Sequence, residues 1–107
     1  MPRQKSAEKA LEVPGMLLDI EKASLKKNGG EIHLTPKETK LMALLMKNVG
    51  KVVSRSELMQ EVWNTEYLGD TRTLDVHICW LRQKIEENPR VPEYILTRRG
   101  QGYELRV

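Results

Sequence analysis

The sequence has 107 residues, which is enough for one domain. Hydrophobic residues make up 39% and charged residues 31%, a balance typical of one modest core under a charged surface. The net charge of +3 is compatible with nucleic acid without establishing it, and no apolar run approaches the ~18–20 residues needed to cross a bilayer.

Cysteine and histidine usage argues against a disulfide, a metal site and an enzyme. The single Cys79 cannot form an internal disulfide, and the N-terminus does not read as a signal peptide, so we expect a cytoplasmic protein. His33 and His77 are the only histidines, and one cysteine cannot complete a metal cage with them. The glycine pairs are too short for a phosphate-binding loop. We therefore expect no cofactor, no metal and no catalytic site.

The N-terminal part is predicted to be a small antiparallel sheet. Residues 1–14 are polar and unpatterned, and we expect a linker or an expression remnant there, with one domain over residues 15–107. Short apolar stretches separated by turn signals predict strands at 16–20, 23–27 and 31–34. Asn28-Gly29, before the third strand, is the commonest two-residue hairpin signal.

The pattern then changes to a helical period. Thr35-Pro36-Lys37-Glu38 combines an N-cap, a proline at the first helical position and a capping-box glutamate, and Gly50 ends this first helix. After a short extended segment at 51–53, Ser54-x-x-Glu57 is a second capping box, which opens a helix running to near Trp63.

A third helix and a hairpin follow. Residues 64–69 are expected to form a loop, and Asp70 or Thr71 caps a helix that reaches about Glu87. The C-terminus reads as a strand at 94–97, a tip at 98–102 and a strand at 103–107. The fold class is therefore α+β, a winged helix-turn-helix with an N-terminal antiparallel sheet, three helices and a C-terminal hairpin wing.

The third helix has two chemically different faces. An apolar stripe of Leu74, Ile78, Leu81 and Ile85 is predicted to be buried, with His77 and Arg82 beside it. The outer half carries Arg72, Val76, Cys79, Trp80 and Gln83, and no acid. Such a face favours DNA, because phosphates would repel a carboxylate. A solvated face with one exposed Trp, or a Trp packed on a neighbouring loop, is equally compatible with the pattern.

The hairpin tip is the second candidate contact surface. Arg98 and Arg99 lie on a tight, glycine-flanked turn, from which arginines reach a minor groove or grip phosphates. The alternative is a hydrated β-turn without a partner.

At these residues the chain resembles the effector domains of OmpR/PhoB-type response regulators. The similarity runs in unbroken order over about residues 15–107, through the segments 34–38, 54–58 with 62–63, 70–78 with 81–85, and 97–103.

The resemblance implies a function in bacterial transcription. In this family the third helix enters the major groove of promoter DNA, the wing touches the minor groove, and paired effectors bind direct repeats. The loop between the second and third helices, here 64–69, contacts RNA polymerase in activators. A receiver domain phosphorylated by a sensor kinase precedes the effector. The chain has no room for a receiver of about 120 residues, so we expect an excised fragment.

The resemblance also implies individual contacts. Arg72, His77, Arg82 and Trp63 match positions that hold the DNA backbone, and wing positions match at Thr97 and Arg99. Cys79 and Trp80 depart from the pattern, because relatives usually carry arginine at one or both places. The full predicted interface is Trp63, Arg72, Val76, His77, Cys79, Trp80, Arg82, Gln83, Thr97, Arg98, Arg99 and Tyr103.

Two further side chains are expected to have structural roles, and one alternative function remains open. His33 is interpreted as structural, and Asp75 as a partner that fixes neighbouring basic side chains. The rival is a winged helix used for protein contact, with Val76, Cys79 and Trp80 as an apolar docking patch.

Overall fold

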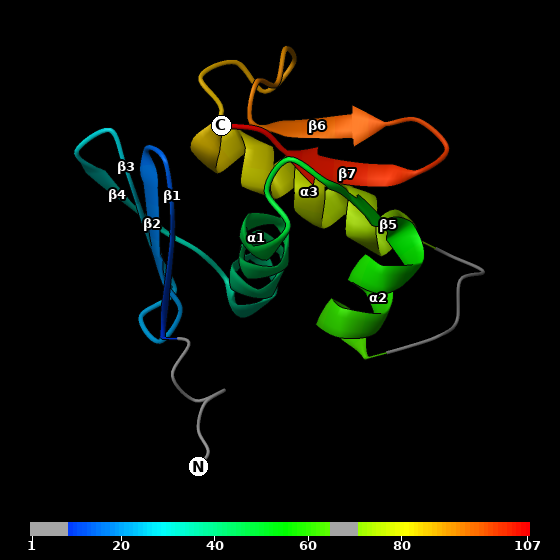
Figure 1. Cartoon of the computed structure of the whole chain (residues 1–107), viewed down its shortest axis with the longest axis horizontal. Coiled ribbons are helices and arrows are strands. Elements are labelled where there is room, and N and C mark those ends of the chain that lie inside the picture. The colour runs from blue at the N-terminus through cyan, green and yellow to red at the C-terminus, as the bar shows by residue number, and fades with distance from the viewer. Residues whose placement is uncertain (1–8, 65–70) are drawn as a thin grey trace.

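The computed structural model describes residues 9–64 and 71–107. Its elements are β1 (Ala10–Val13), β2 (Met16–Asp19), β3 (Ser24–Lys27), β4 (Gly30–His33), α1 (Pro36–Lys47), β5 (Val52–Ser54), α2 (Arg55–Trp63), α3 (Arg72–Ile85), β6 (Ile95–Arg98) and β7 (Gly102–Leu105). The predicted winged helix-turn-helix with an N-terminal antiparallel sheet and a C-terminal hairpin is confirmed (Figure 1).

The N-terminal sheet has one strand more than predicted. Its order is β1-β2-β3-β4, with every neighbouring pair antiparallel. Residues 10–13, expected to belong to the linker, form β1 because Leu11 pairs opposite Leu18 and Val13 is buried. Fully buried Leu18 and Leu25 lie beside each other on the core face of the sheet, which α1 covers.

Two of the three helices begin with the side-chain N-cap hydrogen bond that the sequence predicted. Thr35 and Glu38 form the predicted capping box, in which each backbone N–H donates to the other residue's side-chain oxygen. The Ser54 hydroxyl accepts from the N–H of Glu57 at 3.1 Å. The Thr71 side chain makes no cap bond to α3, because its hydroxyl accepts a hydrogen bond from Arg55 instead. Asp70, the other predicted cap, lies outside the described residues.

Helix α3 ends two residues before the predicted Glu87, and the reason is Glu86. This residue is extended in its backbone and buried, and its carboxylate accepts N–H groups from Glu93, Tyr94 and Ile95 at 2.8–3.2 Å. A carboxylate that satisfies several backbone donors fixes the returning chain against the helix end. Glu86 therefore positions the start of the wing.

The wing is a three-stranded sheet of order β5-β7-β6, not a lone hairpin. The segment expected to be merely extended supplies β5, with Val53 paired to Tyr103. Gly102 makes this pairing possible, because a Cβ there would lie 2.0 Å from the Val53 carbonyl oxygen. The glycine is required by this close approach of two backbones.

The predicted core stripe of α3 is confirmed. Leu74, Ile78, Leu81 and Ile85 are each at most 2% exposed, while Val76 and Gln83 are exposed as predicted. Helix α1 packs against β1, α2 and α3, and α3 runs beneath the β6–β7 hairpin (Figure 1). Within residues 9–64 and 71–107, no helix has the length and apolar character that a membrane crossing requires.

Candidate nucleic-acid interface

The outward face of α3 has the composition that its periodicity predicted. Its five residues are all exposed: Arg72, Val76, Cys79, Trp80 and Gln83. The Gln83 amide nitrogen lies 3.7 Å from the Cys79 sulfur, so these two side chains are neighbours on this face. No acidic side chain belongs to the face, and the only acid within the helix, Asp75, lies on its flank towards α2 and the wing.

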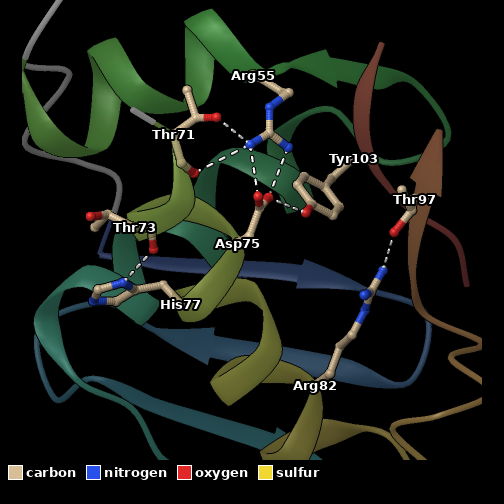
Figure 2. A network of polar contacts seen from close by, with 8 residues as sticks. All are labelled: Arg55, Thr71, Thr73, Asp75, His77, Arg82, Thr97 and Tyr103. Carbon is tan, nitrogen blue, oxygen red and sulfur yellow. Dashed lines mark hydrogen bonds and ion pairs between the residues drawn. The ribbon is translucent and has the colours of Figure 1, made fainter. Parts of the chain in front are cut away.

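Asp75 is paired with Arg55 at the start of α2, as Figure 2 shows. The guanidinium donates to both carboxylate oxygens, at 2.8 and 3.0 Å, and also to the hydroxyl and carbonyl oxygens of Thr71. We expected Asp75 to fix a basic side chain, and that prediction is confirmed. Arg55 itself was missed, because a residue just inside a capping box reads as an ordinary helix start.

Tyr103 lies under the interface, whereas we had expected it among the DNA contacts. It is 5% exposed, and its hydroxyl donates to Asp75 at 2.6 Å (Figure 2). Burial raises the pKa of Tyr103, and the hydrogen bond to Asp75 raises it further. In this arrangement the tyrosine joins β7 to α3 and does not present its ring at the surface.

The same cluster keeps the Asp75 charge compensated. Hydrogen bonds from Arg55 lower the pKa of Asp75, against the opposing effect of partial burial, and the Tyr103 hydrogen bond lowers it as well. An ionised carboxylate that is paired with an arginine repels a nearby phosphate less than an unpaired carboxylate would. The single acid of α3 is therefore no obstacle to an anion on the outward face.

Arg82 and Thr97, both expected to contact DNA, are bonded to each other. Arg82 donates to the carbonyl oxygen of Ile95 from Nε and Nη2, at 3.1 and 2.8 Å, and from Nη2 to the Thr97 hydroxyl at 2.8 Å. Its guanidinium also lies 5.6 Å from the ring centre of Tyr103. The arginine thus connects α3 to β6.

The two arginines of the wing tip differ in their surroundings. Arg98 forms an ion pair with Glu104 across the hairpin at 2.7 Å, so part of its charge is neutralised within the wing. Arg99 is exposed, and no hydrogen bond or ion pair joins its side chain to the part of the chain that the structure describes. Arg99 is the wing cation that is available to a partner.

Three rings form a continuous aromatic cluster between α2 and α3. The His77 ring centre lies 5.0 Å from that of Trp63 and 5.0 Å from that of Trp80, and its Nδ1 lies 2.9 Å from the Thr73 carbonyl oxygen. The Lys37 ammonium lies 5.6 Å from the centre of the Trp63 ring. All three rings belong to the predicted interface, but their contact with one another was not predicted.

Two further features concern residues away from this surface. The backbone oxygen of His33 accepts from Lys84, whose ammonium also pairs with buried Glu38 at 2.6 Å, linking α3 to α1. Across residues 9–64 and 71–107, no group of three or more metal-ligating side chains is assembled. Residues 65–70, which contain most of the predicted polymerase-contacting loop, lie outside the described residues.

Comparison with known proteins gives a consistent result. The family model described as "Transcriptional regulatory protein, C terminal" matches residues 29–105. The chain is 43% identical over 95 residues to the alkaline phosphatase synthesis transcriptional regulatory protein SphR of Synechococcus elongatus. It is 45% identical over 95 residues to the sensory transduction protein RegX3 of Mycolicibacterium smegmatis. Each alignment covers 89% of this chain, but only 37% of SphR and 42% of RegX3.

Solved structures similar to this chain also come from response regulators and their DNA-binding domains. The DNA-binding domain of CpxR from E. coli superposes with a TM-score of 0.78 at 32% identity, covering 91% of this chain and 95% of that one. The response regulator DrrB of Thermotoga maritima, described as an OmpR/PhoB homologue, gives a TM-score of 0.80 at 29% identity. That match covers 96% of this chain and 46% of DrrB.

Proposed function

The chain belongs to the family of C-terminal domains of transcriptional regulatory proteins, as a winged-helix domain of the OmpR/PhoB type, and from this membership we propose that it binds promoter DNA sequence-specifically as the output domain of a two-component response regulator. The family is one of DNA-binding regulators, not of enzymes. The chain spans less than half the length of SphR and RegX3, so the receiver domain and sensor kinase of a complete regulator are part of the proposal.

One surface supports this function above all: the acid-free outward face of α3, beside a wing whose tip exposes Arg99. An α-helix fits the major groove, and an arginine at a hairpin tip reaches the narrower minor groove, where negative potential is concentrated. The bonds from Arg82 to Ile95 and Thr97 keep the helix and the wing in one fixed arrangement. Both elements can therefore engage the same duplex together.

The backbone contacts are assigned to residues at the edges of the helix. Exposed Arg72 in the first turn of α3 and the aromatic cluster of Trp63 and His77 are proposed to lie against phosphates on either side of the groove. Such contacts position a protein on DNA without reading sequence. Arg82 and Thr97 are proposed to act through the wing, with any direct phosphate contact secondary to that role.

The proposed function includes two further macromolecular partners besides DNA. RNA polymerase is proposed to contact the loop at 64–69, and a second copy of the domain to occupy the adjacent direct repeat. Both follow from the family resemblance alone. The rival function, docking of another protein on Val76, Cys79 and Trp80, is favoured by the exposure of this apolar patch.

Salt dependence separates the two functions. We expect the affinity for a selected DNA duplex to fall steeply as salt rises, with a slope of about −0.9 for each phosphate contacted. An Arg72→Ala variant should reduce that slope by about 0.9 and weaken specific and non-specific duplexes alike. DNA binding that is absent, or indifferent to salt, would refute the proposed function and favour the docking patch.

A further inference from the structure

The middle of the outward face of α3 carries no charge. Beyond Arg72 in the first turn, this face consists of the exposed residues Val76, Cys79, Trp80 and Gln83. The cations nearest to them along the helix are directed elsewhere. Arg82 binds the wing through Ile95 and Thr97, and Lys84 pairs with Glu38. Any base edge that meets the middle of this helix meets apolar groups and one amide.

This chemistry restricts which base pairs the face can read. Guanine is read in the major groove chiefly by arginine or lysine on its O6 and N7 acceptors. A glutamine amide matches the N7 acceptor and N6 donor of adenine, and apolar side chains match the C5-methyl group of thymine. Val76 and Trp80 are 43% and 48% exposed, so each offers apolar surface to such a methyl. The neutral face is complementary to A·T pairs.

Trp80 also packs against a neighbouring ring within the domain. Its ring lies 5.0 Å from His77, which in turn stands edge-on to Trp63 at 5.0 Å. Long helical side chains lean towards the N-terminus of the helix, which brings the Trp80 ring over the turn that carries Val76 and His77. A ring that already packs against a neighbour loses less conformational entropy on binding than a free one. It can therefore contribute apolar contact area at low cost.

We propose that this domain reads A·T pairs through thymine methyl contacts of Val76 and Trp80, with Gln83 accepting and donating on an adjacent adenine. This inference rests on the proposed function, since it names the base pairs that the same surface selects. The flanking charges of Arg72 and Arg99 would supply the salt-dependent part of the affinity, and the neutral face the sequence preference.

The test removes the methyl groups from the DNA and leaves the protein unchanged. Duplexes are selected from a random pool with the 107-residue chain, and each thymine of the selected site is then replaced by deoxyuridine, which lacks only the C5-methyl. We expect A·T pairs to be enriched under α3, and each contacted thymine to lose about three- to fourfold in affinity on replacement, the scale of one buried methyl group. Replacements outside the site should have no effect.

Two protein variants assign the effect to the helix. With Trp80→Ala, affinities for the thymine and uracil duplexes should become equal at the position that the ring contacts. The matched control is Val91→Ala, because Val91 is 62% exposed but lies in the loop between α3 and β6. Val91→Ala should keep the full thymine-to-uracil ratio. A thermal melt of each variant verifies that it is folded.

The outcomes distinguish the inference from the proposed function. Salt-dependent binding to selected sites in which uracil replaces thymine without loss would overturn the methyl readout and leave DNA binding intact. Enrichment of G·C pairs under α3 would overturn it equally. If no duplex is enriched, both the inference and the proposed function fail, and the apolar face belongs to a protein partner.

Discussion

Arg82 on α3 and Ile95 at the start of β6 are joined by two hydrogen bonds, from Nε and Nη2 of the arginine to one carbonyl oxygen, at 3.1 and 2.8 Å. A planar guanidinium that donates twice to the same acceptor fixes both distance and angle. Helix α3 and the wing are thus connected by a side chain as well as by the shared core. A family position associated with phosphate contact has an internal structural role here.

The first prediction concerns this connection. Arg82→Ala should increase hydrogen exchange of the β6 amides and weaken binding of both specific and non-specific DNA, because the wing is no longer fixed relative to α3. Loss of the charge-assisted bonds should lower the free energy of unfolding by about 1–3 kcal/mol. Thr97→Val is the control, since it removes only the hydroxyl acceptor at 2.8 Å and should have a smaller effect. Unchanged exchange in β6 for Arg82→Ala would show that the core alone fixes the wing.

The second prediction separates the two arginines of the wing tip. Arg99→Ala should weaken DNA binding by about 1–3 kcal/mol without changing the melting temperature, because its exposed side chain is the available cation. Arg98→Ala should weaken binding less, because Arg98 is already paired with Glu104. Fluorescence anisotropy at physiological salt measures both. Equal losses for the two variants would contradict the distinction between them.

The third prediction follows from the Asp75 cluster. Since hydrogen bonds from Arg55 lower the pKa of Asp75 in the folded state, the ionised carboxylate stabilises the fold above its unfolded pKa of about 3.9. That contribution is lost as pH falls from there through the lower folded pKa. Asp75→Asn should lower the free energy of unfolding by about 1–2 kcal/mol near neutral pH, a figure reduced for partial exposure. Urea titrations from neutral pH down to acid measure it.

The control for this experiment is an exposed carboxylate. Glu21 pairs with Lys9 at 3.7 Å on the surface, so Glu21→Gln should change stability little at any pH. The difference in stability between wild type and Asp75→Asn should narrow below about pH 4. A difference that is constant over the whole range would mean that Asp75 acts by shape and not by charge.

The fourth prediction tests the close approach in the wing sheet. Gly102→Ala would place a Cβ 2.0 Å from the Val53 carbonyl oxygen, so β5 must move away from β7. We expect a loss of about 1–3 kcal/mol in the free energy of unfolding, as for other overpacked sites. Gly30→Ala is the matched control, because its Cβ would lie 3.6 Å from the Lys27 carbonyl oxygen, an ordinary contact. Thermal unfolding of both variants measures the difference.

Periodicity predicted the parts of this domain that depend on one segment at a time. The buried stripe from Leu74 to Ile85 follows from helical spacing, and the Thr35–Glu38 capping box follows from four consecutive residues. The strand β1 was missed because Leu11 and Val13 form too short an apolar pattern to stand out before the pairing with β2 is known.

Contacts between segments that are distant in the chain could not be predicted from the sequence. Arg55 and Asp75 are brought together only by the packing of α2 on α3, and no local pattern indicates it. The same holds for Tyr103, which looks like a surface residue of a glycine-rich turn until β7 is placed between β5 and β6. The acid-free face could therefore be predicted from residue types and helical spacing. The burial of Tyr103 and the pairing of Asp75 depend on tertiary packing, which the sequence does not show directly.

The position of β7 in the wing sheet also has a consequence for how the domain folds. The N-terminal sheet pairs each strand with the next along the chain, so its loops are short and its contacts local. The wing must instead bring Val53 to Tyr103 across the whole of α2 and α3, and closing so long a loop costs entropy before any pairing repays it. We therefore expect the N-terminal sheet to form early in folding and the wing, which carries Arg99, to form late.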